Sequence, residues 1–161
     1  MADIDEVKIR KYYSKIYKFV YMQVKNREDA QDITQEVFYQ YFDKNIVFPD
    51  VEREKAWLFT VARNKCKNHW RTCWYRKIFD EMENISEPKD ISEKEYERKE
   101  DAFYVVSCVS KLPYKYREII HLFYYENMSI EKISKITGKN KSTIQTQLDR
   151  GRKLLKKIMI K

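Results

Sequence analysis

The chain has 161 residues, of which 36% are charged and 43% hydrophobic, so it can form one or two small domains but no large core. Its 2 glycines and 3 prolines are too few for a turn-rich β fold or a glycine-rich phosphate loop. The 3 cysteines, an odd number, argue against a disulfide framework and favour a reducing, cytoplasmic compartment. The net charge of +8 predicts an anionic partner, with nucleic acid ahead of a membrane surface.

Membrane and export signals are not expected from this sequence. No stretch approaches the roughly 18 consecutive apolar residues of a membrane-spanning helix. The first residues are acidic and contain no apolar run, unlike a secretory signal. We therefore expect no membrane insertion.

The charge is unevenly distributed along the chain. Residues 80–100 carry a net negative charge, whereas both flanking regions are net positive. The stretch 80–91 has no helical apolar stripe and contains Pro88, which predicts an exposed, flexible, acidic linker. Helical periodicity resumes after Ser92, a candidate N-cap with Glu95 three residues on. The predicted parts are a first domain over 1–78, a linker over 79–91 and a second domain over 92–161.

Apolar residues recur at helical spacing over 9–25, 27–42 and 57–75, which predicts three helices in the first domain. In the second of these, Asp29, Asp32 and Glu36 form an acidic stripe beside the apolar one. On its own, such a stripe is most simply a solvated face. A metal site is a weaker alternative, because hard cations usually draw their oxygen ligands from a loop or from several elements.

The helix predicted over 57–75 has two distinct faces. The predicted core face carries Leu58, Ala62, Cys66, His69 and Cys73. The opposite polar stripe carries Thr60, Arg63, Asn64, Lys67, Asn68 and Arg71. Asparagine is a poor residue within a helix, so two of them among cations indicate contacts to an external partner. Cations hold phosphates and amides read base edges, so nucleic acid fits this mixture, with a solvated face as the alternative.

Several neighbouring side chains admit a second interpretation. Trp70, Trp74 and Tyr75 lie near the polar stripe and could stack on unpaired bases. Cys66 and Cys73 could be grouped with a histidine as zinc ligands, but a fourth ligand is not evident, so small buried thiols are the preferred interpretation. Their seven-residue spacing is too long for a disulfide along a helix. No metal or other cofactor is expected.

The second domain is predicted to end in a helix-turn-helix. Leu112-Pro113 opens a helix whose inward residues are Tyr116, Ile119, Ile120 and Phe123. Ser129 is a candidate N-cap for the next helix, and Gly138 stands where that helix should end. After a short polar turn, Ser142 is the candidate cap of a final helix with a polar start and a basic later half. A polar, basic second helix is typical of DNA recognition.

Three segments together resemble one protein family. They are Arg27–Phe38 (REDAQDITQEVF), Ala56–Asn64 (AWLFTVARN) with Asn68, and Leu112-Pro113 with Arg117-Glu118 and Met128–Ser134 (MSIEKIS). In this order, with an acidic linker between, the chain resembles the extracytoplasmic-function (ECF) sigma factors of bacterial RNA polymerase over nearly its whole length. The resemblance implies an all-α fold of two small helical domains, the sigma region 2 bundle and the sigma region 4 helix-turn-helix.

The resemblance also implies a role for each site. Core polymerase, through the clamp helices of its largest subunit, would bind Asp29, Asp32, Gln35 and Glu36. The −10 element, as an unpaired strand, would be bound by Arg63, Asn64, Lys67, Asn68 and Arg71. Residues 44–55 would form the loop that accepts a flipped base. The −35 element would be bound in its major groove by Lys141, Ser142, Thr143, Gln145, Thr146 and Arg150. Further implied partners are the polymerase flap and an anti-sigma factor.

The final helix departs from the family pattern. Gln145 and Gln147 stand where the family usually has Lys and Arg, which predicts a weaker grip on phosphates. Gly151 replaces a usual alanine, at about 1 kcal/mol of helix propensity.

The sequence thus predicts a non-enzymatic sigma factor that directs core polymerase to promoters, helps to melt them and works in the cytoplasm at the nucleoid. The alternative is a stand-alone helix-turn-helix regulator, which leaves the acidic stripe and the asparagine pair unexplained. An enzyme is not expected, since the 2 histidines are far apart and no nucleophile–base constellation is present.

Overall fold

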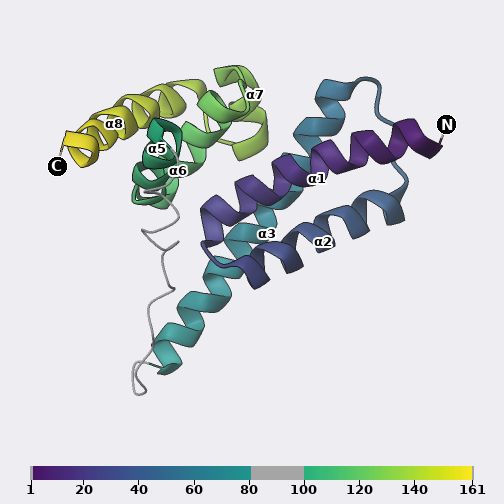
Figure 1. The fold of residues 1–161 in the computed structure, drawn as a ribbon, viewed down its shortest axis with the longest axis horizontal. Coiled ribbons are helices and arrows are strands. Elements are labelled where there is room, and N and C mark those ends of the chain that lie inside the picture. Colours follow the sequence, from purple (N-terminus) through teal and green to yellow (C-terminus); the bar gives the residue numbers. More distant parts are fainter. Residues whose placement is uncertain (1, 81–99, 161) are drawn as a thin grey trace. The chain divides into compact units, whose positions relative to one another are not determined.

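The computed structural model describes residues 2–80 and 100–160, with side chains described for 6–73 and 104–160. Every regular element in these ranges is a helix (Figure 1), so the all-α prediction is confirmed. The chain divides into two compact units, Met1–Lys89 and Asp90–Lys161. Most of the predicted linker and the Ser92 cap lie outside the described residues, so the boundaries 1–78, 79–91 and 92–161 stay predictions. No helix of the described part is both long and apolar enough to cross a membrane.

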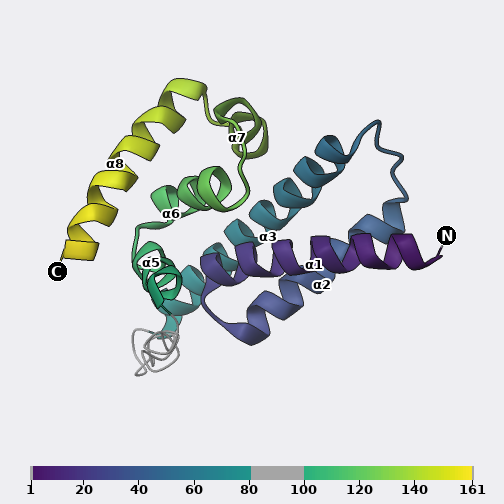
Figure 2. The same cartoon turned by 45° about the horizontal axis from the view of Figure 1, so that its top comes forward.

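The first unit is a bundle of α1 (Ala2–Val24), α2 (Arg27–Lys44) and α3 (Val51–Asp80), in which each helix contacts the other two (Figures 1 and 2). The core is aromatic at its centre, where the Phe19 and Phe59 rings meet edge to face at 5.4 Å. Figure 1 shows the last turns of α3 extending beyond the other two helices. One stretch of α3 is therefore held in the bundle, and its end projects from it.

The helix limits in this unit follow from local capping. Asn26 caps α2 by accepting a hydrogen bond from the Asp29 amide at 3.0 Å, as expected for an Asn before a helix. The carboxylate of Asp50 accepts the Arg53 amide at 2.7 Å, and α3 begins directly after it. The loop predicted over 44–55 is therefore wrong in its second half, because only residues 45–50 between α2 and α3 are not helical.

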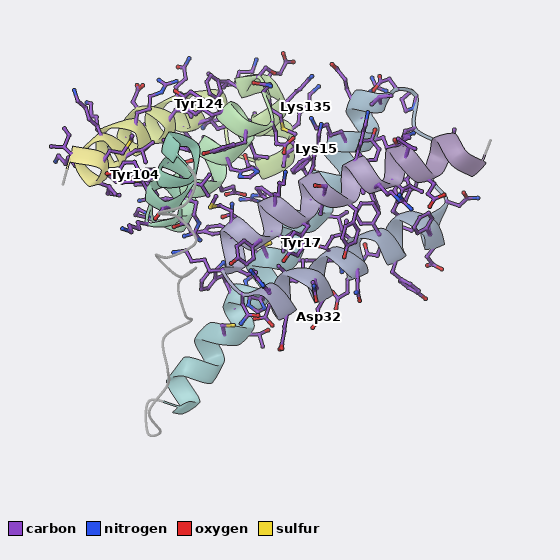
Figure 3. All side chains as sticks on the ribbon, in the orientation of Figure 1. Lys15, Tyr17, Asp32, Tyr104, Tyr124 and Lys135 are labelled. Atoms are coloured by element: carbon purple, nitrogen blue, oxygen red, sulfur yellow. The ribbon has the colours of Figure 1, made fainter. Side chains whose placement is uncertain are left out.

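The second unit contains α5 (Glu100–Ser110), α6 (Tyr114–Ile120), a π-helical turn η1 (His121–Tyr125), α7 (Ile130–Thr137) and α8 (Lys141–Ile160). The helix α8 contacts α5, α6 and α7. Tyr104 of α5 donates its phenolic hydrogen to the Met159 carbonyl of α8 at 2.8 Å (Figure 3 labels Tyr104). The long last helix is thus the element on which the other helices of this unit pack.

The predicted helix-turn-helix is confirmed as α7, residues 138–140 and α8. Ser129 caps α7 by accepting the Lys132 amide at 3.2 Å, and Gly138 ends it with a φ of 73°. The cap of α8, however, is Asn140, whose side-chain oxygen accepts the Thr143 amide at 2.8 Å and the Ser142 hydroxyl at 2.9 Å. The prediction of Ser142 as the cap is wrong, because the helix already begins at Lys141.

The π-helical turn changes which residues face the core. Leu122 is fully buried, whereas Phe123, predicted to point inward, is only half-buried. A π turn adds a residue to the helical repeat, so the inward position shifts by one residue relative to an α-helix. The turn also buries His121, whose pKa falls to about 4 because burial disfavours the charged imidazole.

Gly151 marks the crossing of α6 and α8. A Cβ atom at this position would lie 3.2 Å from Cγ1 of Ile120 and 3.3 Å from Cβ of Tyr116. These distances are shorter than an ordinary van der Waals contact, so the glycine lets the two helices approach closely. The helix-propensity cost expected from the sequence is thus accompanied by a packing role that the sequence did not indicate.

Candidate functional site

A polar stripe runs along the middle of α3. Asn64, Lys67, Asn68 and Arg71 all lie within about 100° around the helix axis, and all four side chains are exposed. Two amides and two cations therefore share one solvent-facing surface, as the sequence predicted. We call these four residues the α3 stripe.

Arg63 does not belong to this surface, although the sequence placed it there. Its side chain is 4% exposed, in line with the buried Phe59 one turn earlier. The helix is covered by both α1 and α2, so its buried arc is wider than a single apolar face. The assignment of Arg63 to an exposed DNA-binding face is therefore corrected.

The aromatic and sulfur-containing residues of α3 lie between these two environments. Trp70 is 37% exposed, whereas the side chains of Trp74 and Tyr75 are outside the described residues. Cys66 is buried as predicted, but Cys73 is half-buried, with its Sγ 3.4 Å from Nε2 of His69. The prediction of a buried Cys73 is wrong, because the end of α3 extends beyond the bundle.

The acidic stripe of α2 separates into an inner and an outer edge. On the inner edge, Asp29 lies 3.4 Å from Nε2 of His69, and Glu36 lies 3.4 Å from the Lys65 ammonium. On the outer edge, Asp32 and Gln35 are exposed, and Figure 3 shows Asp32 projecting from the helix. Among the described side chains, the inner acids thus contact α3, and the outer edge is exposed.

The helix-turn-helix presents a second polar surface on α8. Ser142, Thr143, Thr146 and Arg150 lie within about 100° of each other and are exposed or half-exposed. The other two predicted residues, Lys141 and Gln145, lie on the flank of α8, where Gln145 lines a hollow of about 330 Å³ with Phe123 and Ile130. The hydroxyl of Thr146 donates to the Ser142 carbonyl at 3.0 Å, so its oxygen faces outward mainly as an acceptor.

One buried cluster was not found from the sequence. Glu54 is 7% exposed, and its carboxylate lies 2.7 Å from the Lys8 ammonium and accepts a hydrogen bond from the Tyr41 hydroxyl at 3.0 Å. Burial alone would raise the pKa of Glu54, but hydrogen bonds from Lys8, Tyr12 and Tyr41 together lower it. Burial and the contact with Glu54 raise the pKa of Tyr12 to about 12. The cluster joins all three helices of the bundle. The sequence signal that could have located this cluster is the carboxylate of Glu54, three residues before Trp57.

This cluster fixes the loop between α2 and α3. The Phe48 ring lies parallel to the Tyr41 ring at 6.4 Å and tilted against Trp57 at 5.9 Å. Beside these rings the loop exposes apolar side chains, since Val47 is 92% exposed and Val51 at the start of α3 is 61% exposed. The shortened loop 45–50 is therefore a small, anchored, apolar surface at the end of the bundle.

Family models match both units of the chain. The model "Sigma-70 region 2" matches residues 9–75, and "Sigma-70, region 4" matches residues 102–155. The polar surfaces on α3 and α8 lie within these two matches. The chain therefore belongs to the sigma-70 family, and its relatives place it in the ECF class.

The similar proteins agree with that assignment. RNA polymerase sigma factor SigV of Bacillus subtilis is 28% identical over 142 residues, covering 87% of this chain and 81% of the relative. The ECF RNA polymerase sigma factor SigX of the same organism is 23% identical over 159 residues, covering 92% and 79%. Among solved structures, sigma factor RpoE in complex with the anti-sigma factor NepR from Bartonella quintana has the same fold, with a TM-score of 0.77 at 20% identity over 99% of this chain and 98% of that one.

Proposed function

We propose that this chain is the promoter-recognition subunit of an RNA polymerase holoenzyme. Its first unit would bind core polymerase and the −10 element, and its second unit would bind the −35 element. The observation that carries the proposal is the pairing, in one chain, of an exposed amide-and-cation stripe on α3 with a helix-turn-helix. No chemistry of its own is assigned to the chain, because the polymerase would perform the reaction.

The α3 stripe suits an unpaired strand. Base-pairing edges are occupied in a duplex, so the amides of Asn64 and Asn68 can read them only after the strands separate. Lys67 and Arg71 flank these amides and would hold phosphates. The nearby Trp70 and the apolar loop 45–50 supply surfaces for unstacked bases. These features support a role in promoter melting as well as in binding.

The α8 surface suits the major groove of duplex DNA. Ser142, Thr143 and Thr146 would contact base edges or phosphates, and Arg150 would hold phosphate further along the helix. Lys141 and Gln145, on the flank, would reach the DNA backbone beside the groove. The outer edge of the α2 stripe, Asp32 and Gln35, would contact core polymerase, with Asp29 and Glu36 adjoining it.

Two kinds of protein partner follow from this function. Core polymerase would contact both units, through the clamp helices of its largest subunit and through its flap. An anti-sigma factor would cover the DNA-binding surfaces in the inactive state, and the structurally similar RpoE is itself bound to the anti-sigma factor NepR. Co-purification of the tagged chain from its host should recover a small inhibitory protein. A chain with this role would act at the nucleoid in the cytoplasm.

A stand-alone helix-turn-helix regulator is the competing function, and DNA binding separates the two. The chain alone and the chain with core polymerase are each titrated against the same duplex promoter fragments in a mobility-shift experiment. A sigma factor should form a stable, sequence-specific complex only with core. Tight specific binding by the chain alone, unchanged by core, would favour the regulator and would leave the α2 stripe without a role.

A further inference from the structure

We propose that Lys65 and His69 form a second phosphate-binding row beside the α3 stripe, which Glu36 and Asp29 cover until core polymerase takes up these acids. The inference rests on the proposed function and describes how the polymerase-binding and DNA-binding surfaces influence each other. The juxtaposition that carries it is two cross-helix contacts, each joining a predicted polymerase-binding acid to a basic residue next to a predicted DNA-binding amide.

The positions on α3 make this row continuous with the DNA-binding surface. Lys65 lies three residues before Asn68, so its side chain neighbours that amide on the helix surface, and it stands about 100° around the helix axis from Asn64. His69 follows Asn68 and lies one turn beyond Lys65. The row of two basic residues therefore runs parallel to the stripe, on the side that faces α2.

In the free protein, Glu36 and Asp29 contact the two basic side chains of this row and keep them on the side of α3 that faces α2. The Lys65 side chain is only 18% exposed and reaches the Glu36 carboxylate at 3.4 Å, whereas the Glu36 side chain is 64% exposed. The Asp29 carboxylate is 42% exposed and lies 3.4 Å from His69, which is 20% exposed. The acids are thus open to an incoming partner, while the basic groups are covered.

Exchange of partners is energetically accessible. An ion pair with an exposed member is weak, so a polymerase surface that binds Glu36 can release Lys65 at little cost. The freed ammonium, on its flexible stem, can then reach a phosphate of the strand that Asn64 and Asn68 contact. DNA binding would consequently strengthen when core polymerase binds, and by linkage the reverse also holds.

The test measures binding of the complete free chain to a fluorescent single-stranded oligothymidylate, without polymerase. Glu36→Gln should raise the affinity by about two- to fivefold, the range that an exposed ion pair accounts for, and should steepen the salt dependence by about 0.7 in logarithmic slope. Asp43→Asn is the matched control, because Asp43 is an exposed acid on the same side of α2 with no ion-pair partner among the described residues. It should change the affinity much less.

A second variant distinguishes the release of Lys65 from a simple loss of repulsion between the Glu36 carboxylate and the DNA. In a Lys65→Met background, Glu36→Gln should give no gain in affinity, because the group to be released is absent. A gain that persists with methionine at 65, or equal gains from Glu36→Gln and Asp43→Asn, would overturn the inference. A Glu36→Gln variant with a lower melting temperature and unchanged DNA affinity would also overturn it and would make the pair a structural link between α2 and α3.

The polymerase-bound state gives an independent check. In the holoenzyme, Lys65→Met should shorten the lifetime of promoter complexes and flatten their salt dependence, because the lysine then contacts DNA. Failure of the wild-type chain to direct core polymerase to a promoter would refute the proposed function. If the wild-type chain does so but Lys65→Met has no effect on promoter complexes of the holoenzyme, only the present inference fails.

Discussion

Replacing both amides of the α3 stripe should impair strand opening more than promoter binding. Asn64 and Asn68 are exposed, so Asn64→Ala with Asn68→Ala should leave the fold intact and change its stability by only about 0.5 kcal/mol. If each amide makes one hydrogen bond to an unpaired base, the loss is about 1 kcal/mol per residue. Two such losses correspond to roughly a 30-fold decrease in open-complex occupancy.

The assay compares run-off transcription by the holoenzyme on two templates, a duplex promoter and the same promoter with a mismatched bubble at the −10 element. The double variant should be strongly impaired on the duplex, and the bubble should restore only part of the activity, because the base contacts stay absent. Ser14→Ala, which removes an exposed polar group from α1, is the control and should behave as wild type. Wild-type activity of the double variant on both templates would show that the stripe is only a solvated face.

Three further predictions follow from single positions. Asp32→Asn should weaken binding to core polymerase by about fivefold in a titration, with an unchanged melting temperature, and an unchanged affinity would exclude Asp32 from the interface. Gly151→Ala should change the free energy of unfolding by less than about 1 kcal/mol, because the better helix propensity of alanine is offset by its contact with Ile120. Gly151→Leu should lower the free energy of unfolding by about 1–3 kcal/mol, measured in urea. Equal stability of the two variants would contradict the close crossing of α6 and α8. His121 has a folded pKa of about 4 against an ordinary 6.5, so the unfolded chain binds the extra proton between these values and stability should fall as the pH falls through that window. From pH 7 to pH 5 the loss attributable to His121 is about 2 kcal/mol, measured as the difference between wild type and His121→Gln, and an identical pH dependence of both would contradict it.

Those features that depend on residues close in sequence could be predicted well. The start of α2 after Asn26, the cap at Ser129 and the helix end at Gly138 each depend on side chains within one helical turn. The exposed part of the α3 stripe follows from helical spacing alone. Local patterns of this kind are sufficient because capping and amphipathicity act within a single helix.

The remaining features depend on which helices meet, and no local pattern contains that information. Arg63 is buried because two helices cover α3, whereas the sequence pattern, which assumes one buried face on each helix, places it on the exposed face. Gly151 looks like a weak helix residue until Ile120 of α6 is found against it. The cross-helix contacts of Lys65 and His69, and the buried position of Glu54, likewise join segments distant in sequence.

As a sigma factor, this chain should give core RNA polymerase its promoter specificity. The most direct measurement is in vitro transcription of the host's genomic DNA by core polymerase with and without the chain, followed by mapping of transcript 5′ ends. We expect a limited set of new start sites that share sequence elements near −10 and −35 and appear only when the chain is added. A distribution of 5′ ends identical to that of core polymerase alone would contradict it.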